Sequence, residues 1–257
     1  FKPQDISHPT FDKLVSRPGV AMEDGSLYEG QWDPQTGARH GLGRALLPDG
    51  SYYHGYWLYG KPSIVGRFVY PNGEVFEGIL SKGKPNGKGV LLDAQGYKYE
   101  GQFRDGLRHG LGAEETAEKA SYRGEFFRNL HQGAGELRNP DQTVYTGEFF
   151  EGKYSGRGRF VWPNGEEYEG EWFEDKKHGA GRYQYADGRV YEGDFVDDFP
   201  HGYGVLTLPS GSSLKAFWNR GEPTGFGLKT DKDSKASMIF DQNDTHLRDS
   251  DLSLIAG

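Results

Sequence analysis

Residues 168–188 read Tyr-Glu-Gly-Glu-Trp-Phe-Glu-Asp-Lys-Lys-His-Gly-Ala-Gly-Arg-Tyr-Gln-Tyr-Ala-Asp-Gly, and nearly all of the 257-residue chain is built from copies of this stretch. In outline it has an aromatic-x-Gly-x-aromatic core, a polar loop, a Gly-x-Gly step, an apolar alternation and a turn ending in Gly. The first aromatic position recurs at Tyr28, Tyr53, Phe76, Tyr99, Tyr122, Tyr145, Tyr168 and Tyr191, with Leu214 in a ninth place. The first step is 25 residues and every later step is 23. A fixed period of this size indicates stacked units that each touch only their neighbours.

Each unit is expected to be a β-hairpin. In residues 168–172, aromatic residues and Gly alternate with Glu, which is the period of a half-buried strand. Residues 181–185 alternate in the same way, and turns such as Pro-Asn-Gly at 163–165 close several units. Twenty-three residues are too few for the usual helical repeats. The sequence therefore predicts an all-β fold, an elongated, twisted, single-layer antiparallel sheet made of about eight to nine hairpins.

The glycines between inward aromatics have a packing role in this interpretation. Gly170 lies between Tyr168 and Trp172 on one face of the expected strand. Without a side chain at that position, a neighbouring ring can lie flat across the backbone. The loss of strand propensity is then offset by ring packing.

One stretch in the middle of the chain departs from the pattern. Residues 113–120 (Ala-Glu-Glu-Thr-Ala-Glu-Lys-Ala) contain no inward aromatic and no turn Gly, and their composition favours a helix in a place where the repeat needs a strand. We therefore expect the middle of the array to be its least regular part.

The pattern Tyr-x-Gly-x-Trp/Phe, then His-Gly-x-Gly, then Gly at 23-residue spacing resembles the MORN repeat (membrane occupation and recognition nexus). The resemblance covers roughly residues 20–228, with seven complete aromatic-x-Gly-x-aromatic cores. The third unit has Leu80 at the second aromatic place, and the ninth has Leu214 and Ala216 for Tyr and Gly. The resemblance implies an elongated, twisted sheet with an aromatic-lined groove.

The chain divides into three parts on this interpretation. Residues 1–19 hold three prolines and are expected to form an extended N-terminal lead-in, and residues 20–228 form the repeat array. Residues 229–257 are polar and follow the last repeat, either as a C-terminal cap that protects the open sheet edge or as a tail that docks on the groove or a partner.

Composition narrows the class of protein. With 40 Gly, 14% aromatic residues and only 34% apolar residues, a thin repetitive structure is favoured over one large core. The absence of Cys is compatible with a cytoplasmic location, and no apolar run is long enough to suggest a transmembrane helix. A net charge of −8 argues against nucleic acid as the main partner.

The sequence contains no recognisable catalytic motif. His40, His109, His178 and His201 occupy the same place in their units, so neighbours lie about 10 Å or more apart, too far to share a metal ion. The regularly recurring Glu residues indicate a solvated face or a docking strip for a basic partner. Residues 83–89 superficially resemble a phosphate loop but lack its Gly-Lys-Ser/Thr ending. We expect no enzyme activity, no cofactor and no metal site.

The candidate site is instead the aromatic face, because one sheet layer cannot cover it completely. Its richest part is expected to be a partner-binding groove formed by Tyr145, Phe149, Phe160, Trp162, Tyr168, Trp172, Tyr183, Tyr185, Tyr191 and Phe195. The predicted function is a non-catalytic scaffold that holds a helix or extended peptide of a protein partner in this groove.

The family resemblance adds a cellular setting and two alternatives. It implies a cytoskeletal or ciliary assembly, as in radial spoke heads and binders of unconventional myosin tails. The first alternative is a module that tethers membrane or phosphoinositide through basic residues on the hairpin edge, and the second is the repeat region of a larger enzyme. Basic edge residues are Lys61, Lys82, Lys84, Arg108, Arg128, Lys153, Lys176, Lys177 and Arg220. A homodimer formed through the C-terminal end, around Trp218, is a further expectation.

Overall fold

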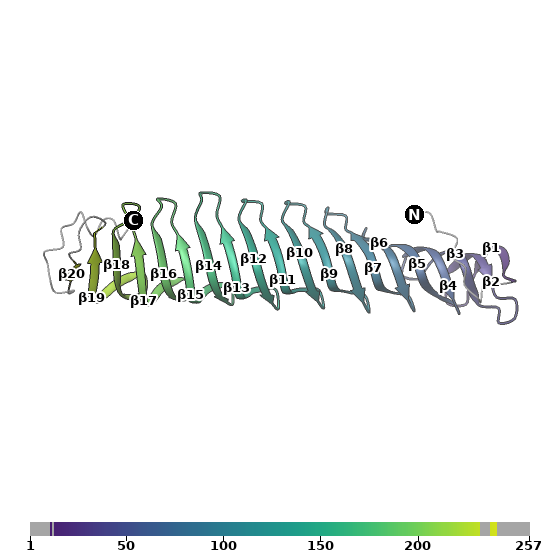
Figure 1. Ribbon diagram of the computed structural model, residues 1–257. Helices are drawn as coiled ribbons and strands as arrows, with labels where there is room; N and C mark the ends of the chain where they lie inside the picture. The colour runs from purple at the N-terminus through teal and green to yellow at the C-terminus, as the bar shows by residue number, and fades with distance from the viewer. Residues whose placement is uncertain (1–10, 12, 232–236, 241–257) are drawn as a thin grey trace. The chain divides into compact units, whose positions relative to one another are not determined.

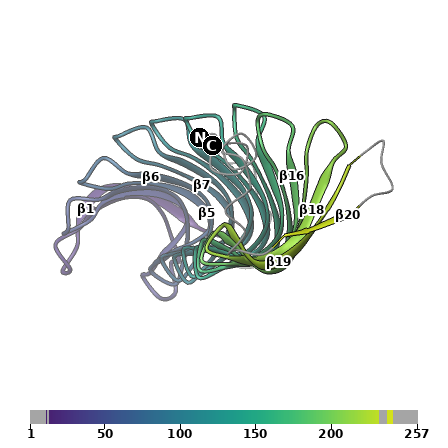
Figure 2. The same cartoon turned by 90° about the vertical axis from the view of Figure 1, so that its left-hand side faces the viewer.

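The computed structural model describes residue 11, residues 13–231 and residues 237–240 (Figure 1). These residues contain no α-helix, and their twenty strands belong to one antiparallel sheet, which confirms the predicted all-β meander of hairpins. The chain separates into two compact units, residues 1–130 and 131–257. Within each unit, consecutive strands lie side by side in chain order and are curved along their length (Figures 1 and 2).

The first unit holds ten strands, each hydrogen-bonded to the next. They are β1 (Val15–Ala21), β2 (Leu27–Trp32), β3 (Arg39–Leu46), β4 (Tyr52–Leu58), β5 (Lys61–Val69), β6 (Val75–Ser81), β7 (Lys84–Leu92), β8 (Lys98–Arg104), β9 (Leu107–Glu115) and β10 (Ser121–Phe127).

The second unit repeats this arrangement, with β11 starting at the boundary. Its strands are β11 (Leu130–Arg138), β12 (Val144–Phe150), β13 (Lys153–Val161), β14 (Glu167–Phe173), β15 (Lys176–Gln184), β16 (Val190–Val196), β17 (Phe199–Thr207), β18 (Ser213–Asn219), β19 (Glu222–Thr230) and β20 (Ser237–Phe240). The edge of β19 is paired with β20, which follows the last repeat.

Two-residue turns close most of the hairpins, whereas β2 and β3 are joined by residues 33–38. Between β14 and β15, Glu174 and Asp175 both have positive φ, 49° and 67°. This is the type I′ geometry, whose twist matches that of the strands on either side. The Asp175 carboxylate also accepts a 2.8 Å hydrogen bond from the backbone N–H of Tyr154 in the preceding hairpin. Asp198 does the same for Lys177 one hairpin later, at 2.9 Å. The turn residues therefore tie successive hairpins together.

The stretch expected to be irregular is regular in the structure. Residues 113–115 complete β9, and residues 116–120 form the same turn as other repeats. The N–H of Thr116 donates to the carbonyl of Ala120 at 2.8 Å, and Lys119 takes the positive-φ position, 71°, that Gln142 fills in the next repeat and Gly in the others. The expectation was wrong because strand pairing on both sides of β9 overrides local helix propensity.

The packing role expected for the glycines is confirmed. A Cβ placed on Gly170 would lie 2.5 Å from the Tyr168 hydroxyl and 2.6 Å from the Cα of Gly181. A Cβ on Gly181 would lie 2.5 Å from the same hydroxyl. The Tyr168 ring therefore lies across both strands, and its hydroxyl donates to the Glu171 carbonyl at 2.8 Å, next to the register shift between β14 and β15.

This Tyr-over-Gly arrangement is repeated along the chain. In each case the hydroxyl donates to the carbonyl three residues further on, over 2.7 to 3.2 Å. The other donors are Tyr28, Tyr53, Tyr99, Tyr122, Tyr145 and Tyr191. In the third repeat the position of this tyrosine is occupied by Phe76, which has no hydroxyl. We call the face of the sheet that carries these rings the aromatic face, and the opposite one the outer face.

Candidate partner-binding surface

The ten predicted groove residues all lie in the second unit, and they separate into two groups. Seven are buried, each no more than 9% exposed, namely Tyr145, Phe149, Phe160, Tyr168, Trp172, Tyr191 and Phe195. The other three, Trp162, Tyr183 and Tyr185, are half-buried. The buried seven form the packed core of the aromatic face, and the other three are the part that a partner can reach.

The buried rings form a continuous edge-to-face series. The Tyr168 and Trp172 ring centroids are 5.1 Å apart at 86°, and those of Tyr168 and Phe195 in the next hairpin are 5.0 Å apart at 79°. Tyr145 meets Trp172 at 5.4 Å. These separations and angles are favourable for aromatic pairs. The rings stabilise the stack of hairpins, and each repeat is locked to its neighbour.

In several hairpins the residue two places after the turn covers the aromatic face. Tyr154 stacks on Tyr145 with centroids 3.9 Å apart. One repeat later this residue is Lys177, whose Nζ lies 4.6 Å from the Tyr183 centroid, 5.5 Å from that of Trp162 and 5.9 Å from that of Tyr168. The sequence predicts Lys177 at the hairpin edge with the other basic residues, but in the structure it lies on the aromatic face.

Charges around Lys177 are arranged to hold it there. Burial lowers the pKa of its ammonium group, and the carboxylates of Asp198 and Glu166 act in the opposite direction. The Tyr183 hydroxyl donates to Glu166 at 3.0 Å, and burial followed by the Glu166 charge raises the pKa of that hydroxyl. The hydroxyl therefore stays protonated as a donor. We call Trp162, Glu166, Lys177, Tyr183 and Tyr185 the Lys177 cluster.

The Lys177 cluster is suited to binding. It combines half-buried rings, one cation over ring faces and one carboxylate. Arg189 extends it, with its guanidinium 4.7 Å from the Tyr185 centroid and a 2.6 Å hydrogen bond to Asp187. No nucleophile stands beside a base in it. In the part of the chain that the structure describes, no three His, Cys, Asp or Glu side chains are grouped as metal ligands.

The basic residues of the hairpin edge are largely paired in the second unit. Lys176 lies 2.9 Å from Asp197 of the next hairpin, and Lys153 lies 3.8 Å from Glu174. The two lysine pairs link successive hairpins and reduce the positive charge that the edge presents. In the first unit Arg108 lies over the Tyr99 and Phe126 rings of the aromatic face and is bonded to Glu114 and Tyr97.

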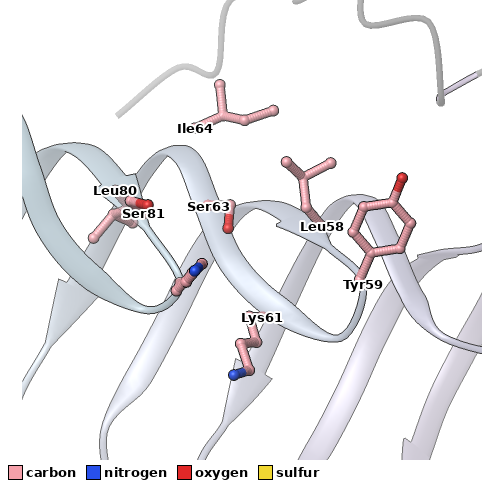
Figure 3. A pocket seen from close by; sticks show the side chains of 8 residues that line it. Leu58, Tyr59, Lys61, Ser63, Ile64, Leu80 and Ser81 are labelled. Carbon is pink, nitrogen blue, oxygen red and sulfur yellow. The ribbon is translucent and has the colours of Figure 1, made fainter.

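A pocket of about 510 Å³ opens at the hairpin edge of the first unit (Figure 3). Leu58, Ile64 and Leu80 give it an apolar lining, and Lys61 and Lys82 also line it. Ile64 has φ of 68°, at the position where other repeats have Gly, so its backbone is strained. None of the predicted groove residues lines this pocket, and its lining contains no carboxylate or His.

The outer face carries exposed aromatic side chains that the sequence analysis did not single out. In the second unit they are Phe150, Phe173, Phe199, Tyr203 and Phe217. The sequence signal was the apolar residue directly after the second core aromatic, at Phe150 and Phe173. That residue points away from the aromatic face because side chains alternate along a strand.

The fold and the candidate site together define a repeat protein of stacked β-hairpins with an aromatic face. The family model for the MORN repeat matches residues 28–52, 53–75, 76–96, 99–115, 122–144, 145–167, 168–188 and 191–213, more than half of the chain. The chain belongs to the MORN-repeat family. No curated protein matches the sequence significantly. The described residues include no helix of the length and apolarity needed to span a membrane.

Several solved structures are similar at low sequence identity. The TCP10 domain of Danio rerio CPAP, in complex with a peptide of Danio rerio STIL, is 15% identical with a TM-score of 0.45, covering 89% of this chain and 99% of that one. The SAS-4 TCP domain of Drosophila melanogaster, in complex with a proline-rich motif of Ana2, is 14% identical with a TM-score of 0.32, covering 82% and 96%. A streptogramin B lyase is 11% identical with a TM-score of 0.17, covering 88% and 82%. Likenesses at these scores carry no functional argument.

Proposed function

We propose that this chain is a non-catalytic scaffold that binds a helix or extended peptide of a protein partner across the Lys177 cluster. The observation that carries the proposal is the half-buried trio Trp162, Tyr183 and Tyr185, which continues the packed aromatic core to the surface. Membership of the MORN-repeat family supports a cytoplasmic setting in a cytoskeletal or ciliary assembly.

The chemistry of the Lys177 cluster favours a partner of mixed character. Trp and Tyr are the residue types that dominate binding energy at protein interfaces, since they bury large rings and keep one polar group. The partner would cover these rings with apolar side chains. Lys177 and Glu166 would then orient the partner, since Lys177 attracts an acidic group and Glu166 a basic one.

The test compares variants of the full chain in co-purification from the cells that make it, followed by mass spectrometry. Trp162→Ala is expected to remove the partner, because Trp162 is only half-buried and its truncation leaves the seven buried rings of the aromatic face in place. Phe173→Ala is the matched control, an exposed ring on the outer face. Trp172 is unsuitable because it is buried and its indole N–H donates to the Gly158 carbonyl at 3.1 Å. Equal recovery of the complex by folded Trp162→Ala and wild-type protein would refute the proposal.

The alternative functions have less support from the structure than binding of a protein partner. Attachment to an anionic membrane or phosphoinositide needs free positive charge at the edge, whereas Lys153 and Lys176 are paired with acids. Co-sedimentation with anionic vesicles at physiological salt tests it directly. A role as the repeat region of a larger enzyme stays a prediction, as does a homodimer. In a dimer built on strand pairing at the end of the repeats, β20 and not β18 would be the strand presented, because β19 is already paired.

A further inference from the structure

A site on the outer face of the first unit is occupied by the chain itself. The Phe11 ring stacks on Tyr56 with centroids 5.5 Å apart at 13°, and meets His40 edge-on at 5.5 Å and 80°. Leu14 lies beside them, since its Cδ1 is 2.4 Å from where a Cβ on Gly41 would be. Under this cover Tyr56 is 6% exposed and His40 is 1% exposed. The seat is therefore filled by a Phe and a Leu three residues apart.

The same seat exists in the second unit. In the strand register, Leu42 pairs with Tyr56 in β3 and β4, and Tyr203 pairs with Phe217 in β17 and β18. Counted within the repeat, His201 corresponds to His40 and Gly202 to Gly41. Both glycines have positive φ, 79° and 64°. A His, a positive-φ Gly and an aromatic ring are therefore presented in the same order on the same face.

This second seat is bare. Phe217 is 60% exposed and Tyr203 is 55% exposed, and His201 is also exposed. Their two rings pack on each other at 5.8 Å and 69° without further cover. Phe199, also exposed, adds apolar surface on β17. Exposed aromatic rings grouped in this way on a soluble surface are typical of an interaction site.

Neighbouring repeats of the second unit do not share this feature. The cross-strand pair at the same place is Arg157 with Glu171 in one repeat and Ala180 with Asp194 in the next. These four side chains are exposed and none is aromatic. An aromatic pair at Tyr203 and Phe217 is a departure that the repeat itself does not need.

We propose that His201, Tyr203 and Phe217, the outer aromatic patch, bind a segment of a partner protein that carries an aromatic side chain and an aliphatic side chain three residues apart. The occupied seat in the first unit shows the chemistry that fits, with a ring stacked on the strand aromatic and an aliphatic group over the positive-φ Gly. A second copy of the chain is disfavoured as the source, because its own Phe11 and Leu14 are already seated. The site does not depend on the Lys177 cluster, which lies on the other face.

The test uses a synthetic peptide with the sequence of residues 9–16, Pro-Thr-Phe-Asp-Lys-Leu-Val-Ser, as the probe. The fluorescently labelled peptide is titrated with the full chain and followed by anisotropy. We expect a dissociation constant on the order of 10 µM to 1 mM, which is common for a short segment with two anchors. Replacing its Phe by Ala is expected to weaken binding at least about tenfold, a change of about 1.4 kcal/mol.

Variants of the chain locate the binding. Phe217→Ser is expected to weaken binding at least about tenfold, and Phe173→Ser, which removes an equally exposed outer-face ring, is expected to leave it unchanged. Both side chains are largely solvated, so unfolding midpoints should match wild type. Peptide that exchanges with Phe11 in the first unit would be insensitive to Phe217→Ser. Three results would each overturn the proposal. They are peptide binding that survives Phe217→Ser, equal affinities of the original peptide and its Phe-to-Ala version, and no binding at about 5 mM peptide.

Discussion

The Tyr-over-Gly arrangement makes a quantitative prediction about Gly170→Ala. The new Cβ would lie 2.5 Å from the Tyr168 hydroxyl and 2.6 Å from the Gly181 Cα, both inside contact distance. Forcing a methyl group into a packed core typically costs about 1–3 kcal/mol. The ninth repeat contains a natural version of the Gly-to-Ala change. Ala216 occupies the Gly position there, two residues after Leu214, and is 1% exposed. Removal of the ring should therefore make the Ala tolerable.

A double-mutant cycle measures this coupling. Tyr168→Leu alone loses ring packing and the hydrogen bond to the Glu171 carbonyl, at a cost of about 2–4 kcal/mol. Adding Gly170→Ala to Tyr168→Leu should cost less than adding it to wild type, with a coupling of about 1–2 kcal/mol.

The assay is urea unfolding of all four proteins, followed by circular dichroism and by tryptophan fluorescence. Because repeat arrays can unfold in stages, the free energies are compared only where both probes give the same midpoint and slope. If the double variant's cost equals the sum of the single costs to within about 0.5 kcal/mol, the ring does not require the glycine and the reasoning fails.

Three further predictions concern the same hairpins. Tyr168→Phe, which copies the Phe76 found in the third unit, removes the hydroxyl donor to Glu171 and should lower the unfolding free energy by about 0.5–1.5 kcal/mol, measured by urea titration. Burial lowers the pKa of Lys177 in the folded protein. Between that pKa and the unfolded value of about 10.4, the unfolded state binds more protons, so the stability of the fold rises with pH. Lys177→Met should remove this rise in unfolding midpoints measured from neutral to alkaline pH, and an unchanged pH dependence would contradict the explanation. Asp198→Ala and Asp198→Gly both lose the bond to the Lys177 N–H, but only Gly adopts the turn's 75° φ at low cost. Asp198→Ala should therefore destabilise more than Asp198→Gly, and calorimetric melting that ranks Gly below Ala would exclude that explanation.

Much of the fold could be predicted because the residue pattern within each repeat specifies its strands and turns. The alternation around Tyr168 and Gly170 gives the strand, the face and the reason for the glycine, all within a few residues. Residues 113–120 misled the sequence analysis for the opposite reason. Their local propensity favours a helix, and only pairing with strands on both sides makes β9 regular there.

The candidate site was harder to predict. Residues 174–177 are all charged and were assigned to a loop, yet the turn is only two residues long and β15 begins at Lys176. Strict alternation back from Tyr183 would have placed Lys177 on the aromatic face. The cover of Tyr56 by Phe11 could not be predicted in this way, since Phe11 precedes the repeats and its contact follows no period.

The reach of each tyrosine hydroxyl has a consequence for how the chain acquires its structure. Tyr168 bonds a carbonyl three residues away, and its ring crosses only the two strands of its own hairpin. The ring also meets Phe195 of the next hairpin. Contacts of this kind close within a hairpin or between neighbouring hairpins, which are short separations relative to a chain of 257 residues, and this favours rapid folding. As the chain leaves the ribosome, each later hairpin can add to the edge of the hairpins before it.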